Sequence, residues 1–141
     1  KNEAKKLLGF NYKKIIIIGD SAGGNMATSI ILWSINKENN IESPDGAILI
    51  YPSLNRTPTI STPSLEKMKN DGVLPFSFKT CYTNAYIDPL WDSIRKKWKF
   101  NENNSNCKEY YLSPITVPDN NVIDFPSCYI ICGTCDPLWC D

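Results

Sequence analysis

A short apolar strand that turns directly into a helix is the feature that most constrains the fold. Four consecutive isoleucines occupy residues 15–18, the sequence Gly-Asp-Ser-Ala-Gly-Gly-Asn follows at residues 19–25, and a mostly apolar stretch comes next. Gly19 and Gly23 are expected to let the two backbones pass closely, where a Cβ would clash. This order of strand, Gly-x-Ser-x-Gly and helix is the context of a nucleophile elbow, with Ser21 raised at the apex.

The elbow predicts one nucleophile and one oxyanion donor. The Oγ atom of Ser21 would face a base and a substrate, and the N–H of Ala22, at the start of the helix, would point toward a developing oxyanion. A simpler interpretation is a strand-to-helix turn in which the serine only caps the helix. The motif residues are Gly19, Asp20, Ser21, Ala22, Gly23, Gly24 and Asn25.

Three continuous apolar runs predict an α/β fold with a parallel sheet. They occupy residues 14–19, 46–51 and 128–132, and runs without alternation favour strands that are covered on both faces. A helix over residues 22–37 would join the first two strands in a right-handed crossover. Its apolar residues go most of the way round, so we expect it to be deeply buried.

The segment between the second and third strands is too long for a simple crossover. Core segments at about 1–53 and 113–141 would enclose cap-like or covering helices at about 54–112. A helical excursion between core strands is where an open α/β fold can carry a lid, and ordinary covering helices remain the alternative. Helix-like stretches lie near residues 64–70, 75–86 and 89–99.

The tetrapeptide Asp-Pro-Leu-Trp occurs twice, at residues 88–91 and 136–139, and offers two candidate acids. A triad acid lies just beyond a core strand, at the same sheet edge as the serine. Asp136 follows the third predicted strand and meets this condition, whereas Asp88 follows a helix-like segment. Asp136 is also placed to cap a helix that begins at Pro137, and both roles are compatible.

The chain of 141 residues contains no histidine, so a Ser-His-Asp triad within it would lack its base. Lys plus Arg and Asp plus Glu balance at 15 each, which argues against a nucleic-acid-binding surface. No apolar run is long enough to span a membrane. Either the triad chemistry is absent, or its histidine lies outside this chain.

The six cysteines support a second, weaker interpretation. We expect reduced thiols, which favours a cytoplasmic location. Cys132-Gly133-Thr134-Cys135 follows the third strand, and a Cys-x-x-Cys at that place is also compatible with redox or metal chemistry. The paired spacing that is typical of zinc sites is missing, and the Gly-Thr pair also serves as a simple turn.

The chain resembles the hormone-sensitive lipase family of α/β-hydrolases. The family's serine motif reads as residues 19–25 do, and its later landmarks match Tyr51-Pro52 and Leu112-Ser113-Pro114. Its acid motif, Asp-Pro-Leu-x-Asp-Asp/Glu, matches residues 136–141 except at Cys140. Residues 63–87 look more like the eukaryotic hormone-sensitive lipases than the small bacterial esterases.

The resemblance implies a serine carboxylic ester hydrolase acting on a small-molecule or lipid ester, with Ser21 as nucleophile, Asp136 as triad acid and Ala22 in the oxyanion hole. It implies neither an organic cofactor nor a metal. The family's upstream His-Gly-Gly-Gly loop and its catalytic histidine are not in this sequence, so we expect an interior piece of a longer hydrolase that is inactive alone. The plant gibberellin receptors, similar to this family, have lost the histidine, so a non-catalytic receptor is the alternative. The oligomeric state is left open.

Overall fold

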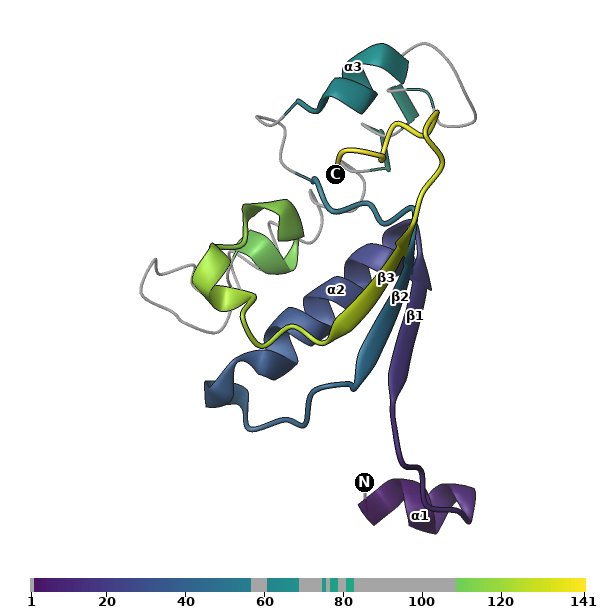
Figure 1. The fold of residues 1–141 in the computed structure, drawn as a ribbon, viewed down its shortest axis with the longest axis vertical. Helices are drawn as coiled ribbons and strands as arrows, with labels where there is room; N and C mark the ends of the chain where they lie inside the picture. Colours follow the sequence, from purple (N-terminus) through teal and green to yellow (C-terminus); the bar gives the residue numbers. More distant parts are fainter. Residues whose placement is uncertain (1, 57–60, 69–74, 76, 79–80, 83–108) are drawn as a thin grey trace.

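A computed structural model describes residues 2–56, 61–68, 75, 77–78, 81–82 and 109–141. In this part of the chain, three parallel strands form one sheet in the order β1-β2-β3 (Figure 1). The strands are β1 (Ile16–Asp20), β2 (Gly46–Ile50) and β3 (Ser127–Ile131). The predicted partial α/β-hydrolase fold is confirmed, and each strand lies within two residues of its predicted bounds.

One long helix, α2, connects β1 to β2 and packs against the sheet. It ends two residues earlier than predicted, because Asn36 adopts an extended conformation and its side chain accepts a hydrogen bond from Glu38 N at 3.1 Å. The described helices are α1 (Asn2–Leu8), α2 (Ala22–Ile35) and α3 (Pro63–Met68). The described 3-10 turns are η1 (Lys37–Asn39), η2 (Glu109–Tyr111), η3 (Pro114–Thr116) and η4 (Asp119–Asn121).

The predicted excursion is only partly described. The α3 helix corresponds to the first of the three helix-like stretches, near residues 64–70. Of the stretch at 75–86, only residues 75, 77–78 and 81–82 are described, and 89–99 lies outside the described residues. The division into core and cap-like segments therefore stays a prediction.

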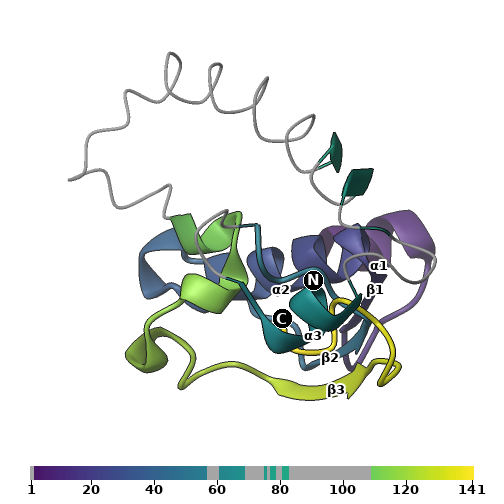
Figure 2. The same ribbon diagram turned by 90° about the horizontal axis from the view of Figure 1, so that it is seen from above.

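The hydrophobic core lies between α2 and one face of the sheet. Because side chains alternate along a strand, Ala47 and Leu49 of β2 both point toward α2, where they meet Ala27 and Ile31. These four residues are at most 3% exposed. Figure 2 shows α2 lying along one side of the sheet.

The opposite face of the sheet is exposed, and the prediction of coverage on both faces is wrong for the described residues. Ile18 of β1 is 63% exposed, and Tyr129 and Ile131 of β3 are 75% and 56% exposed. The predicted deep burial of the helix is also wrong, since Met26 and Trp33 are 58% and 40% exposed. Only one stripe of α2 can face the sheet, so its other apolar residues lie outside the core.

The topology brings two predicted site segments to one edge of the sheet. Parallel strands end at the same edge, and the loops that follow β1 and β3 leave there on either side of β2 (Figure 1). Two strand spacings separate the ends of β1 and β3 by about 10 Å. Within the described residues, no helix has the length and apolar character needed to cross a membrane.

Candidate active site

The predicted nucleophile Ser21 lies at the apex of a tight turn between β1 and α2. Its backbone has φ of 50° and ψ of −117°, a conformation that costs a non-glycine residue about 1–3 kcal/mol. Main-chain hydrogen bonds hold the turn: Ser21 N donates to Ile50 O at 2.9 Å, and Ser21 O accepts from Ser53 N at 3.1 Å. The side chain makes no capping hydrogen bond to α2, so the geometry does not support the simpler helix-capping interpretation.

Two glycines allow the close approach at this turn: Gly19, as predicted, and Gly24 in place of the predicted Gly23. A Cβ on Gly19 would strike the backbone of Gly23, and a Cβ on Gly24 would lie 2.7 Å from the Cβ of Pro52. A Cβ on Gly23 would meet only the Asp20 side chain, at an ordinary 3.6 Å. The expectation that Gly23 is needed for steric reasons is therefore wrong, because the loop after β2 packs against Gly24 instead.

Ala22 is the first residue of α2. The first N–H groups of a helix lack partners within the helix and carry its positive dipole end. The Ala22 N–H thus directly follows the Ser21 apex, as the predicted oxyanion donor requires. Its role in an oxyanion hole stays a prediction.

Asn25 connects three segments that are distant in the sequence. Its side chain is buried, and Nδ2 donates to Ser53 O at 2.8 Å and to Leu112 O at 3.1 Å. The second bond joins residues 87 positions apart. The sequence marked Asn25 only as part of a motif, and the structure shows that it holds the loops around the turn together.

Asp20, the residue before Ser21, points away from the core. Its Oδ2 accepts a long hydrogen bond from the hydroxyl of Tyr51 at 3.4 Å, and both side chains are exposed. Tyr51 directly follows β2 and has φ of 35°, and its N–H donates to Ile131 O at 2.6 Å. The loops after β1 and β2 are thus linked at the same sheet edge.

The predicted acid Asp136 lies in the turn that follows β3. Its Oδ1 accepts a hydrogen bond from Leu138 N at 2.8 Å, and its N–H donates to Gly133 O at 3.0 Å. The predicted helix at Pro137 is wrong, because residues 137–140 form a turn, and the Asp136 carboxylate closes that turn instead of capping a helix. A carboxylate has a second oxygen with further acceptor capacity, so this bond leaves the predicted triad role open. Asp88 lies outside the described residues.

A serine in α3 holds the Asp136 turn. Ser64 is 8% exposed, and its Oγ donates to Pro137 O at 2.8 Å while it accepts from Cys140 N at 3.1 Å. The same turn is linked to the loop after β2, because Asp141 Oδ2 accepts from Asn55 N at 3.2 Å. Sequence reasoning missed the roles of Ser64 and Asn55. No local pattern signals a bond such as that from Ser64 to Pro137, which joins residues 73 positions apart.

Cys132, the first cysteine of the Cys-x-x-Cys sequence, has the wrong electrostatics for a redox site. Burial, together with the nearby Asp136 and Asp141 carboxylates, raises the pKa of the Cys132 thiol. Reactive Cys-x-x-Cys sites lower that pKa instead. The five cysteines that the structure describes carry free thiols, and the described His, Cys, Asp and Glu side chains form no group of three that could hold a metal.

Comparison with solved structures gives matches along nearly the whole chain. Carboxyl esterase 2 of the fungus Tuber melanosporum and the hyperthermophilic esterase of the archaeon Pyrobaculum calidifontis each match with a TM-score of 0.72 at 23% identity. EstE1, a thermostable carboxylesterase from a metagenomic library, matches with a TM-score of 0.63 at 22% identity. Each match covers 96% of this chain, and the chain spans 39–40% of the length of these esterases.

The family comparison agrees with the fold. No curated protein matches the sequence. A family model described as the alpha/beta hydrolase fold, Abhydrolase_3, matches residues 1–141. The chain therefore belongs to the hormone-sensitive lipase family of α/β-hydrolases.

Proposed function

We propose that this chain supplies the nucleophile and the acid of a serine carboxylic ester hydrolase whose histidine comes from sequence outside these 141 residues. The observation that carries the proposal is the Ser21 turn. Ser21 combines a positive φ, no capping bond and a position at the N-terminus of α2. A residue held in a costly backbone conformation without a local structural use is typical of a functional site.

In the proposed reaction, Ser21 Oγ attacks the ester carbonyl and gives its proton to the imidazole. The imidazolium then protonates the leaving alcohol. In the second half of the reaction, water attacks the acyl-enzyme and gives its proton to the imidazole, which returns a proton to Ser21 Oγ as the acid leaves. Asp136 would orient the imidazole and stabilise its charged form. Two strand spacings, about 10 Å, separate the ends of β1 and β3, and the imidazole would have to bridge Ser21 and Asp136 across the end of β2.

The Ala22 N–H would donate to the tetrahedral oxyanion. Loss of one such donor from an oxyanion hole typically costs about 3 kcal/mol of transition-state stabilisation. Because the donor belongs to the backbone, side-chain substitution at Ala22 leaves it in place. The proposed substrates are carboxylic esters, in line with the esterase matches.

Activity-based labelling of the longer protein that contains this chain tests the proposal. We expect a fluorophosphonate to label Ser21, p-nitrophenyl esters to be hydrolysed, and Ser21→Ala to abolish both. Asp136→Asn should lower turnover by about 10⁴-fold, because the imidazole loses its partner and its correct tautomer. Asp88→Asn, in the repeated tetrapeptide, is the matched control. Full turnover in Asp136→Asn would refute the choice of acid, and absence of both labelling and turnover would favour the receptor alternative.

A further inference from the structure

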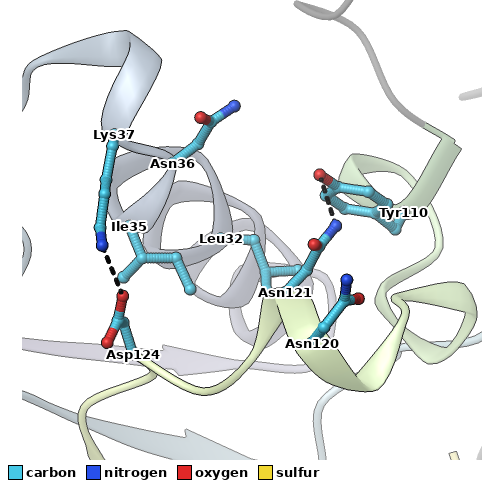
Figure 3. A pocket seen from close by; sticks show the side chains of 8 residues that line it. All are labelled: Leu32, Ile35, Asn36, Lys37, Tyr110, Asn120, Asn121 and Asp124. Atoms are coloured by element: carbon cyan, nitrogen blue, oxygen red, sulfur yellow. Dashed lines mark hydrogen bonds and ion pairs between the residues drawn. The ribbon is translucent and has the colours of Figure 1, made fainter.

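A cavity lies at the end of α2 far from the predicted nucleophile. It has a volume of about 300 Å³ and lies between the C-terminal end of α2 and the turns η2 and η4 (Figure 3). Ser21 precedes the first residue of this 14-residue helix, and a rise of 1.5 Å per residue puts the two ends about 20 Å apart. The cavity is therefore separate from the candidate active site. Its lining residues are Leu32, Ile35, Asn36, Lys37, Tyr110, Asn120, Asn121 and Asp124.

Uncharged groups that both donate and accept hydrogen bonds dominate the polar part of the lining. Asn36, Asn120 and Asn121 contribute three amides, and Asn121 Nδ2 donates to the Tyr110 hydroxyl at 3.3 Å (Figure 3). An amide offers two N–H donors and a carbonyl acceptor. Such a set matches ligands whose groups also donate and accept, and hydroxyl groups do both.

The charges of the lining cancel one another. Lys37 Nζ lies 3.9 Å from Asp124 Oδ2, and both side chains are largely exposed at the rim. One cation and one anion leave no net charge to attract an ionic ligand. The half-buried Ile35 side chain contributes apolar surface that can contact C–H groups, whereas Leu32 is only 3% exposed.

A buried hydroxyl lies on the residue that follows the cavity-lining Tyr110, outside the lining itself. It belongs to Tyr111, whose ring packs edge-on against Tyr110 with ring centres 4.8 Å apart. Burial raises the pKa of Tyr111, and the side-chain amides of Asn36 and Asn39 oppose this rise.

We propose that this cavity binds a small neutral polyol, such as a hexose or a cyclitol. The hydroxyls of the ligand would exchange hydrogen bonds with the three amides, and its C–H groups would contact Ile35. A volume at the lower end of the range for ligand sites fits a ligand of this size. The proposal is independent of ester hydrolysis, because it uses no residue of the predicted triad.

Nuclear magnetic resonance on the ¹⁵N-labelled 141-residue chain tests the proposal, with D-glucose and myo-inositol as probes. We expect saturable shifts of the side-chain NH₂ signals of Asn36, Asn120 and Asn121. D-Gluconate and D-glucosamine, which carry a charge, should bind at least about tenfold more weakly, a difference of about 1.4 kcal/mol. Failure of both neutral probes to shift these signals, or equal binding of the charged probes, would overturn the proposal.

A pair of variants separates the cavity from the rest of the surface. Asn121→Leu removes an amide of the lining and should weaken polyol binding at least about tenfold, whereas Asn11→Leu, at an exposed asparagine elsewhere, should leave it unchanged. Unchanged binding in Asn121→Leu would contradict the proposal. If that variant fails to fold, the side-chain signals of the unsubstituted chain decide the question alone.

Discussion

Gly23 and Gly24 lie side by side in the first turn of α2 and are predicted to respond in opposite ways to substitution by alanine. A methyl group on Gly24 would lie 2.7 Å from the Pro52 Cβ and 2.9 Å from its Cα. Real Cβ atoms do not approach other carbons so closely, and the obstacle includes backbone, so the loop after β2 must move. A methyl group on Gly23 would meet only Asp20 Oδ1, at 3.6 Å.

The expected effect is the difference in the free energy of unfolding between Gly24→Ala and Gly23→Ala. Both substitutions replace glycine by alanine in the first turn of the same helix, so the gain in helix propensity, at most about 1 kcal/mol, is similar in both. Overpacking adds about 1–3 kcal/mol of destabilisation to Gly24→Ala alone. We therefore expect the free energy of unfolding of Gly24→Ala to lie about 1–3 kcal/mol below that of Gly23→Ala.

Urea denaturation of the 141-residue chain, followed by circular dichroism, measures this difference. With a slope of about 1–3 kcal/mol per molar urea, the two midpoints should differ by about 1 M. Gly23→Ala itself should be at least as stable as the unsubstituted chain. Equal midpoints for the two variants would refute the argument that Pro52 packs against Gly24.

Three further predictions concern stability, pH and activity. Ser64→Ala removes a hydroxyl that bonds the main chain of the Asp136 turn twice and should cost about 1–3 kcal/mol of unfolding free energy. Exposed Ser127→Ala should cost under about 0.5 kcal/mol, and equal losses in urea titrations would count against this role of Ser64. Burial raises the pKa of the Cys128 thiol, so the thiol loses its proton at a lower pH in the unfolded state than in the folded state. The free energy of unfolding should therefore fall as the pH rises above about 8.5. Cys128→Ala should show a smaller fall, and the same pH profile in this variant as in the unsubstituted chain would contradict the prediction. The isolated chain should hydrolyse p-nitrophenyl esters no faster than background, because its sequence holds no histidine; turnover that disappears in Ser21→Ala would show that another base acts.

The sequence alone determined the elements whose causes are local. Four isoleucines ahead of a Gly-x-Ser-x-Gly predicted β1, the turn and α2, because apolar runs and glycine positions act on neighbouring residues. The same reasoning predicted a parallel sheet and placed Asp136 after its third strand. The position of Ser21 was predictable in this way, while its catalytic role and that of Asp136 stay predictions.

Only the tertiary structure decided which distant segments touch. Sequence reasoning assigned the close approach to Gly23, whereas packing by Pro52 makes Gly24 the demanding position. The contacts of Asn25 with Leu112 and of Ser64 with Pro137 join positions 87 and 73 apart. The exposure of one sheet face likewise depends on which segments pack against it. An apolar strand has the same sequence pattern whether that face is covered or exposed. Long-range partners leave no periodic signal in a single sequence, and so the physical reason for these contacts lies in the assembled fold.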